Sequence, residues 1–459
     1  MKWWIRFLIA GTLFVCALGV ARAQTQTTET SETTNARHIT LSEAVQLALK
    51  HNHLVRIAGY KVEESQHAKE RAKSAYFPTI RNQSSVLKVT DTQFIQIVAG
   101  ELGTLGGIPN PEHSATINQG GKTFVTSGTE LVQPITQLFS KVKPTNDIAQ
   151  ANLDASRATA QETENEIALK VHEIYYRVLI AQLHRSAVDA RIRAAQELQS
   201  ERVQEVTYGS TLQQDVIESS AQALQAKQEL LSTELALSDL TLQLNDVIGV
   251  PLTTKLELDA RVPQVQAGCE REECVKIALE SHPEIVAARD ELRKASGSLQ
   301  LSKAEYIPDV SAVARYSYTS DVPFLARNFG TFGVSFTYDI FDGGRRRAAV
   351  RESNSQLNEA KENLARVSEE IEVRVQTASN KLERTREMVK VSEELLALRT
   401  ESSRTFAQQL ANGSALKAQV DAAVAQEFDA KTILLQSQLD FIQAQDELNV
   451  AIGTLPEKL

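Results

Sequence analysis

The chain has 459 residues and a formal net charge of −9, with 49 lysines and arginines against 58 aspartates and glutamates. This acidic balance argues against binding to nucleic acid, because contact with phosphates depends on a basic surface. The two tryptophans, Trp3 and Trp4, both lie in the first few residues.

The N-terminus has the three parts of a secretory signal peptide. Lys2 and Arg6 form a basic region, residues 5–20 are apolar, and Ala21-Arg22-Ala23 is a small-x-small cleavage motif. The sequence therefore predicts a signal peptide over residues 1–23 and an exported protein. Its removal changes the net charge from −9 to −12, because three basic residues and no acid are lost.

Two cysteines remain after export, Cys269 and Cys274. In an oxidising compartment such a close pair favours a local disulfide. Loop closure would then stabilise the folded state by about 2 kcal/mol. The alternative is two free thiols near the start of a helix.

The first part of the mature chain is a polar, low-complexity segment over 24–37 that we predict to be disordered. A first repeat over 38–250 follows, and Thr40 with Glu43 forms a capping box at its start. Its predicted elements are a helix over 40–75, strands over 80–90 and 123–135, a glycine- and proline-containing loop over 91–122, a long helix over 144–208 and a helix over 212–248.

A linker over 251–268 leads to a second repeat over 269–453, and residues 454–459 form a tail. The repeats align at an offset of 230 (Ala48-Leu49 with Ala278-Leu279) and then of 204 (Gly209-Ser210 with Gly413-Ser414). This self-similarity predicts a duplicated architecture. The elements predicted for the second copy are a helix over 271–305, strands over 310–319 and 331–341, a long helix over 345–410 and a helix over 415–452.

The two long helices contain no proline or glycine beyond their first residues. At 1.5 Å per residue each could reach about 95 Å, far beyond the size of a compact domain. Apolar residues such as Ile167, Val171 and Ile174 alternate in steps of four and three. Sustained heptads of this kind indicate a coiled coil.

Residues 331–341 alternate strictly between apolar and polar side chains, as in Phe332, Val334 and Phe336. This period of two predicts a strand with one apolar face. No apolar run after the signal peptide is long enough for a spanning helix, so we expect any membrane contact to come from strands. A sheet in lipid must close, and four strands are too few because the smallest barrels have about eight. Three copies would supply twelve.

Aromatic residues stand where the predicted helices and strands meet. This is the place expected for an interfacial aromatic belt. The alternative is that the rings pack against their own helices. The residues are Tyr76, Phe77, Phe139, Tyr306 and Phe341.

The chain resembles the TolC-like family of outer membrane efflux proteins, or outer membrane factors. The resemblance rests on the repeated helix–hairpin–long-helix order, on Phe341-Asp342-Gly343-Gly344-Arg345 and on the terminal Leu-Asn-x-x-Ile-Gly. It implies a mainly α fold with transmembrane β, in which a homotrimer forms a twelve-stranded β-barrel, four strands per chain. The barrel would lie in outer membrane lipid of a diderm bacterium and continue as a periplasmic α-barrel.

The resemblance also gives roles to the residues at the helical tips, as adaptor contacts and as a periplasmic constriction. Tips of the family have a glycine with an aspartate six residues later, which Gly209 and Asp215 match. Glu218 follows on the same helix face. We hypothesise that these two acids give the closed end its negative charge, whereas the alternative is that they cap or solvate the helix.

The second tip departs from the family pattern. Gly413 is present, but Gln419 and Ala422 stand where acids often occur in the family, and Asp421 is displaced by one position. The resemblance therefore does not predict a complete acidic ring from this repeat.

No catalytic, cofactor or metal site is predicted. Gly121-Lys122-Thr123 lacks the earlier glycine of a phosphate-binding loop. His51 and His53 would point to different sides of a helix. We interpret the protein as a channel and not as an enzyme.

The sequence thus predicts the outer membrane exit duct of an efflux or type I secretion system. The resemblance implies a passive channel that works with a periplasmic adaptor (membrane fusion protein) and an inner-membrane pump, without a cofactor. The alternative is a periplasmic coiled-coil adaptor or scaffold without a pore. Such a protein would share the heptads but would need a soluble β-domain with a buried core.

Overall fold

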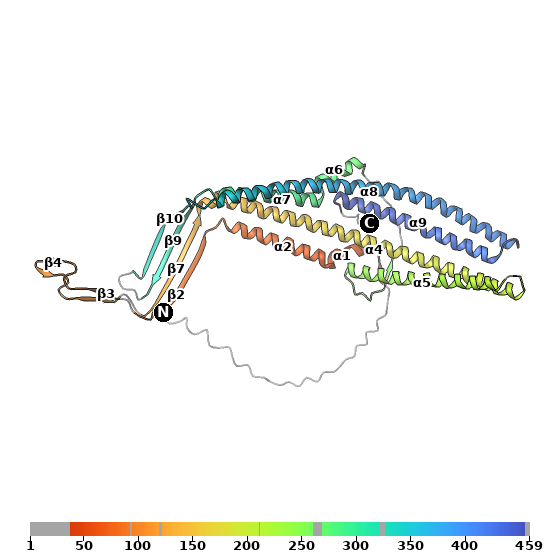
Figure 1. The fold of residues 1–459 in the computed structure, drawn as a ribbon, viewed down its shortest axis with the longest axis horizontal. Coiled ribbons are helices and arrows are strands. Elements are labelled where there is room, and N and C mark those ends of the chain that lie inside the picture. Colours follow the sequence, from red (N-terminus) through yellow and green to blue (C-terminus); the bar gives the residue numbers. More distant parts are fainter. Residues whose placement is uncertain are drawn as a thin grey trace, which may run out of the picture.

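The computed structural model describes residues 37–91, 94–118, 122–210, 212–259, 269–320 and 326–454. The protein is a long helical rod with a sheet at one end (Figure 1). The predicted signal peptide and most of the predicted disordered segment lie outside the described residues, as do 260–268 of the linker and 455–459 of the tail.

The two repeats have the same order of elements. The first contains α1 (Leu41–His51), α2 (His53–Ser74), β2 (Thr79–Lys88), β7 (Thr123–Pro134), α3 (Ile135–Ser140), α4 (Val142–Thr207) and α5 (Gln213–Ile248). The second contains α6 (Arg271–Ser281), α7 (Pro283–Ala304), β9 (Asp309–Thr319), β10 (Asn328–Thr337), α8 (Arg345–Ala411) and α9 (Lys417–Ile452).

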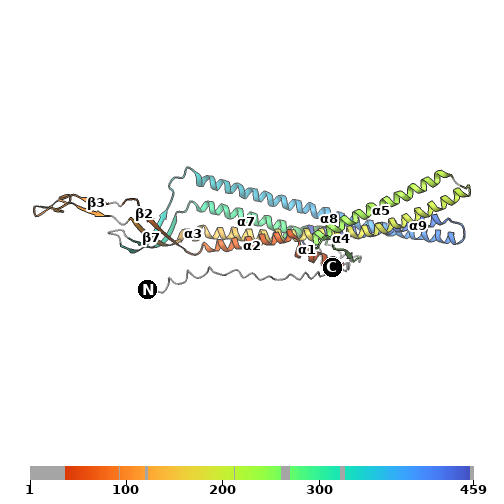
Figure 2. The same cartoon turned by 90° about the horizontal axis from the view of Figure 1, so that it is seen from below.

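The rod is built around the two long helices, α4 with 66 residues and α8 with 67. Helices α2 and α7 lie along the half next to the sheet, and α5 and α9 lie along the other half (Figure 1). Away from the sheet, α4 with α5 and α8 with α9 form antiparallel pairs that each end in a tight turn (Figure 2). No helix in the described ranges is both long and apolar enough to cross a membrane.

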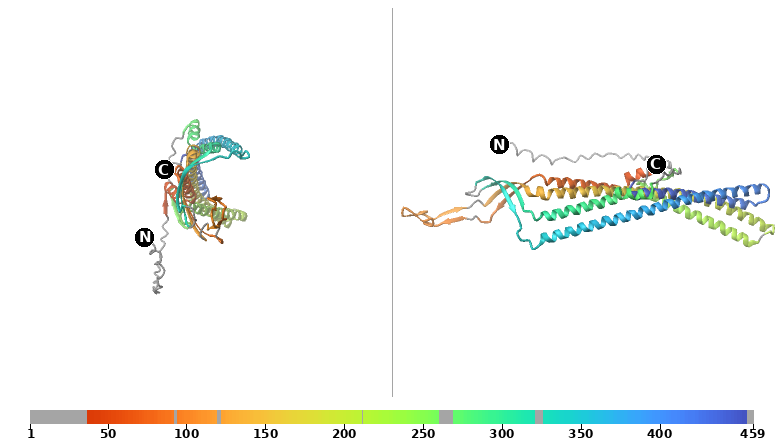
Figure 3. Two further views of the ribbon diagram at one scale, coloured as in Figure 1. Left: turned by 90° about the vertical axis from the view of Figure 1, so that its left-hand side faces the viewer. Right: turned by 90° about the horizontal axis from the view of Figure 1, so that it is seen from above.

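The sheet is antiparallel with the strand order β10-β9-β7-β2, so the hairpins of the two repeats join through β7 and β9. It is curved when viewed along the rod (Figure 3). Paired residues on neighbouring strands share a face. One row of partners is entirely apolar and consists of Phe332, Ala314, Leu131 and Ile80. The adjacent row is polar and consists of Thr331, Arg315, Glu130 and Arg81.

Two apolar cores lie at mid-length, where α1 and α6 cover the rod (Figure 1). The first includes Val171, Tyr175 and Leu244, all at most 2% exposed. The second includes Ile371 and Val375, both fully buried. The heptad positions of the long helices therefore supply much of the buried surface.

The helices predicted over 40–75 and 271–305 are each divided in two. The breaks are at Asn52 (φ −62°, ψ 132°) and His282 (φ −59°, ψ 133°), which both cap the following helix. Pro283 explains the second break, because a proline forces the preceding residue into extended backbone. At the first break the Asn52 amide donates to the Val247 carbonyl at 3.2 Å, a contact 195 residues away.

Short strands occur where the sequence predicted disorder, linker or loop. β1 (Arg37–Ile39) pairs in parallel with β8 (Leu256–Leu258). Arg37 is therefore part of a strand, and the linker contributes to the fold. The predicted 91–122 loop contains two small hairpins, formed by β3 (Phe94–Ile97) with β6 (Ala115–Asn118) and by β4 (Thr104–Leu105) with β5 (Ile108–Pro109).

Candidate functional site

The end of the rod opposite the sheet consists of two helical tips. At the first, Gly209 has a φ of +72°. The Ser210 N–H donates to the Glu205 carbonyl at 2.9 Å, and the Gly209 N–H donates to the Val206 carbonyl at 3.0 Å. These bonds form a Schellman motif, which needs a left-handed residue and favours glycine. Gly413 (φ +73°) ends α8 in the same way.

Asp215 has a structural role at the first tip. Its carboxylate accepts a hydrogen bond from the Leu212 N–H at 3.1 Å, at the start of α5. At the equivalent place in the second repeat, the Gln419 amide oxygen accepts from the Leu416 N–H at 3.0 Å. Capping therefore explains an acceptor at this position, but it does not require a negative charge.

The remaining tip residues differ between the repeats. Glu218 is exposed one helical turn beyond Asp215. Asp421 is half-buried, close to Lys417, which pairs with Glu197 of α4. The hydrogen bond that the Lys417 ammonium donates to Glu197, supported by the charges of Glu197 and Asp421, raises the pKa of Lys417. The second tip thus combines its acid with a base.

A cleft of about 610 Å³ lies beside the tips, between α4, α5 and α9. Arg191 of α4 lies on its wall and bridges the two repeats. Its guanidinium donates to Glu229 of α5 at 2.5 Å and to Asp429 of α9 at 2.7 Å. The hydrogen bond to Glu229 is the main cause of a raised pKa at Arg191. Sequence reasoning did not identify this ion triad.

The junction aromatics lie where the sheet meets the helices, and all five are exposed in the single chain. Phe139 and Phe341 expose 82% and 89% of their surface. The ring of Tyr306 lies under the Arg346 guanidinium, 5.5 Å from its centre. The placement of these five aromatics at a membrane interface stays a prediction.

Cys269 and Cys274 are joined by a disulfide, with their Cα atoms 5.6 Å apart. Cys274 is fully buried in the second apolar core. The bond therefore links the residue before Glu270 to the first turn of α6, next to this core.

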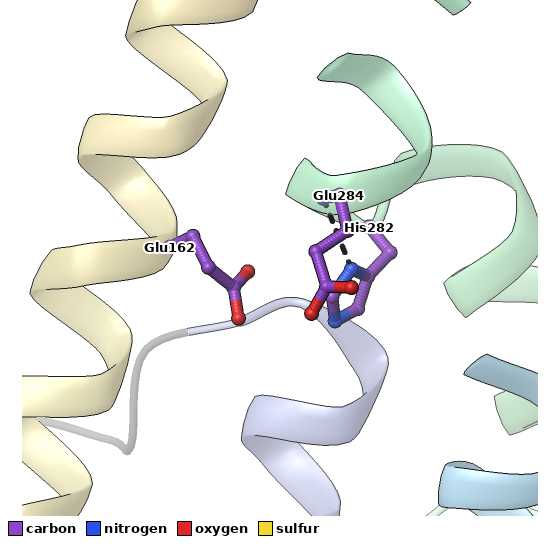
Figure 4. Close-up of side chains that lie close together, drawn as sticks. All are labelled: Glu162, His282 and Glu284. Carbon is purple, nitrogen blue, oxygen red and sulfur yellow. Dashed lines mark hydrogen bonds between the residues drawn. The ribbon is translucent and has the colours of Figure 1, made fainter. Parts of the chain in front are cut away.

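A polar cluster that sequence reasoning missed lies between the repeats, and we call it the junction cluster. It contains Glu162 of α4, His282 and Glu284 at the α6–α7 break, and Arg374 of α8. Figure 4 shows Glu162 facing the His282–Glu284 pair. One ligand atom from each of these three side chains lies within 4.8 Å of the others. The His282-Pro283 dipeptide was the available sequence signal, but nothing local pointed to Glu162.

Comparison with known families finds a match in the second repeat. Residues 274–454 match the family model described as outer membrane efflux protein. This match covers most of the second repeat. A search of the curated proteins finds no match by sequence.

Solved structures resemble the chain in fold over a longer range than the family model covers. A membrane protein from Pseudomonas aeruginosa has a TM-score of 0.72 at 17% identity, covering 90% of both chains. The CmeC outer membrane channel of Campylobacter jejuni has a TM-score of 0.73 at 13% identity, covering 90% of this chain and 85% of that one. VceC of Vibrio cholerae has a TM-score of 0.70 at 15% identity, and the match covers 91% of this chain and 97% of that one. The prediction of a TolC-like fold is confirmed.

Proposed function

We propose that three copies of this chain form a passive exit duct in the outer membrane of a diderm bacterium. Twelve strands, four from each chain, close a β-barrel, and the helices continue it as an α-barrel through the periplasm. A periplasmic adaptor and an inner-membrane pump deliver substrates, which pass through without chemistry. The match to the outer membrane efflux family and the fold shared with solved channels support this proposal.

The main support for the proposal comes from the two open edges and the apolar face of the sheet. Strands β2 and β10 lie at its edges, and neither pairs with a further strand within the described part of the chain. The apolar row runs across all four strands, and Phe332 in that row is 92% exposed. An open, apolar sheet edge is an aggregation hazard and is not tolerated in lipid. Pairing of β10 with β2 of the next copy removes both edges.

The two faces of the sheet fit different surroundings. The row with Phe332 and Ile80 would face lipid, and the row with Arg315 and Glu130 would face a watery lumen. The exposed aromatics at the strand–helix junction would then form the girdle at the periplasmic interface. In this orientation the two helical tips point toward the pump.

The tips are the proposed periplasmic constriction and adaptor contact. Asp215 and Glu218 from three chains would bring six carboxylates together at the closed end. Gly209 and Gly413 hold the turns that an adaptor would contact, and Gln419 and Asp421 would complete the ring with fewer charges. The 610 Å³ cleft opens beside these turns and could receive a partner helix.

Disulfide crosslinking between edge strands tests the proposal directly. Double variants would carry one cysteine on β2 (Gln83→Cys or Ser85→Cys) and one on β10 (Ser335→Cys or Thr337→Cys), which covers several registers. We expect dimers and trimers on oxidation and no larger species. The matched control is Thr126→Cys with Thr319→Cys, partners on β7 and β9 of one chain, which should give monomers only.

Conductance in planar bilayers provides the second test. If the protein is a duct, the purified trimer should form discrete ion channels. The proposal would be refuted if no channels appear and if the edge-strand cysteines crosslink only within a monomer. The rival function is a periplasmic adaptor or scaffold. Recovery of the wild type in the periplasmic fraction without detergent would favour that rival.

A further inference from the structure

The junction cluster joins parts of the chain that belong to different repeats. Glu162 is in the middle of α4, while His282 and Glu284 stand at the break between α6 and α7. The imidazole of His282 is fully buried. Its Nε2 and the Oε2 of Glu162 are both buried atoms that have no hydrogen-bond partner among the described residues. Two polar groups that each need a partner therefore converge on one place.

Capping of α7 uses only one of the two ring nitrogens of His282. Its Nδ1 accepts a hydrogen bond from the Glu284 N–H at 3.2 Å. Asn52 caps α2 in the same manner at the equivalent break, and its amide also donates to the Val247 carbonyl. On His282 the second nitrogen instead faces two carboxylates, although the Val450 carbonyl also lies near this ring. The equivalent of Glu284 in the first repeat is Leu54, so this arrangement belongs to the second repeat.

The charges of the cluster do not balance. Arg374 donates to Glu284 Oε1 at 2.6 Å and occupies that carboxylate. Burial, followed by the charges of Glu284 and Glu166, raises the pKa of Glu162 to about 7, although the charge of Arg374 acts in the opposite direction. Burial also lowers the pKa of His282. A dication would supply the positive charge that the site lacks.

We propose that Glu162, His282 and Glu284 form a binding site for a divalent transition metal of the Zn²⁺ class. Imidazole with carboxylates suits such ions, whereas Ca²⁺ and Mg²⁺ prefer oxygen ligands alone. Zinc ligands lie about 2.0–2.2 Å from the ion, so their atoms are closer to one another than the 4.8 Å limit within which these three atoms lie. Binding would therefore draw the ligands together, which a rotation of the Glu162 side chain would achieve. Coordination through Nε2 moves the ring proton to Nδ1 and ends the bond from the Glu284 N–H.

Such an ion would connect the first repeat to the second through α4 and the α6–α7 break. Gly453, at the end of α9, packs against the same break, because a Cβ placed there would lie 2.8 Å from the His282 Cα. The metal would therefore act where α4, the α6–α7 break, α8 and the end of α9 meet. This inference does not depend on the proposed duct.

Metal binding can be measured on the detergent-solubilised full-length mature chain with Co²⁺ as a spectroscopic probe and Zn²⁺ as competitor. We expect one Co²⁺ per chain, visible absorption bands from a nitrogen- and oxygen-ligated ion, displacement by Zn²⁺, and a rise in Tm with Zn²⁺. His282→Asn is the most informative variant, because Asn52 already caps the equivalent break. His282→Asn and Glu162→Gln should each weaken Co²⁺ binding by at least about tenfold.

The control is His67→Gln, which removes an exposed histidine paired with Glu70 on the surface of α2. It should bind Co²⁺ like the wild type. Equal Co²⁺ affinity in the wild type, His282→Asn and Glu162→Gln would overturn the proposal, and so would the absence of a bound ion in the wild type. If His282→Asn fails to fold, the near-isosteric Glu162→Gln decides the question alone.

Discussion

The Nδ1 atom of His172 on α4 lies 2.6 Å from the Oδ2 atom of Asp446 on α9, and both side chains are buried. The pair joins the long helix of the first repeat to the last helix of the second. Tyr176 lies edge-on to His172, with ring centres 5.9 Å apart. Burial and the nearby Asp446 charge raise the pKa of the Tyr176 hydroxyl, which therefore stays protonated.

Removal of one member of this pair should be strongly destabilising. His172→Leu leaves the Asp446 carboxylate buried without its partner, which typically costs about 3–5 kcal/mol. The double variant His172→Leu/Asp446→Leu should recover much of that loss, because no charge is then left unpaired. Thermal unfolding followed by circular dichroism measures both. A double variant that is less stable than either single variant would contradict this explanation.

The two faces of β10 should respond differently to a charge. Phe332→Lys places an ammonium on the apolar row, where insertion near the bilayer midplane costs about 2–4 kcal/mol. Thr331→Lys places it on the polar row, one residue away. We expect Phe332→Lys to reduce the yield of membrane-inserted trimer and Thr331→Lys to leave it nearly unchanged. Equal yields would show that the apolar row does not face lipid.

The sequence predicted the features that local patterns determine. The heptads and the absence of internal proline and glycine located α4 and α8 within a few residues, and the Gly209 and Gly413 signals located both tips. Period-two alternation located β10 approximately, but the predicted range 331–341 extends past the end of the strand at Thr337 and misses its start at Asn328. Each of these signals acts over a few consecutive residues, which is why it can be read without tertiary information.

Other features depend on contacts between distant residues. The break at Asn52 uses a carbonyl of α5, and the three-residue β1 is held by β8 more than 200 residues later. His172 with Asp446, and Glu162 with His282, meet only after the repeats have packed. The break at His282 did not depend on a distant contact in this way, because Pro283 was a visible sequence signal for it. The continuous helix predicted over 271–305 was wrong.

The start of α8 should carry an acid-sensitive contribution to stability. The Asp342 carboxylate accepts from the Arg346 Nε at 2.7 Å, from the Arg346 N–H at 3.1 Å and from the Gly344 N–H at 2.9 Å. The hydrogen bond from the Arg346 side chain is the main cause that lowers the pKa of Asp342 to about 2. Because the folded pKa is below the unfolded value, this contribution is present above about pH 4 and is lost as the pH falls toward 2.

Asp342→Asn tests this contribution, since an amide oxygen can still accept hydrogen bonds but does not titrate. We expect the Tm of the wild type to exceed that of Asp342→Asn at pH 5, and the difference to shrink steadily between pH 4 and pH 2. The comparison isolates one group, because the other carboxylates titrate in both proteins. A difference in Tm that does not vary with pH would contradict the prediction.

The disulfide should contribute modestly and locally. Closure of the short loop between Cys269 and Cys274 is worth about 2 kcal/mol. Replacement of both residues by alanine should lower the stability of α6 by about this amount and leave the tips unaffected, as measured by amide hydrogen exchange. Intact mass should increase by the mass of two protons and two electrons on reduction. An unchanged mass, or equal exchange rates in the variant, would show that the bond has no such role.

At the tips, charge and capping can be separated. Asp215→Asn keeps an oxygen that can accept from the Leu212 N–H, as Gln419 does in the second repeat. Glu218→Gln likewise keeps the shape of its side chain. The double variant should therefore retain the fold and the channel conductance while its periplasmic end loses six negative charges per trimer.

We expect divalent cations added on the periplasmic side to block this double variant at least severalfold less strongly than the wild type in planar bilayers. The ring of carboxylates concentrates cations at the closed end, and that attraction disappears with the charge. Asp421→Asn is the matched control, because it removes a single acid from the second tip, where the Lys417 ammonium lies close by. It should change the block little. Equal block in the wild type and the double variant would leave Asp215 with its capping role alone.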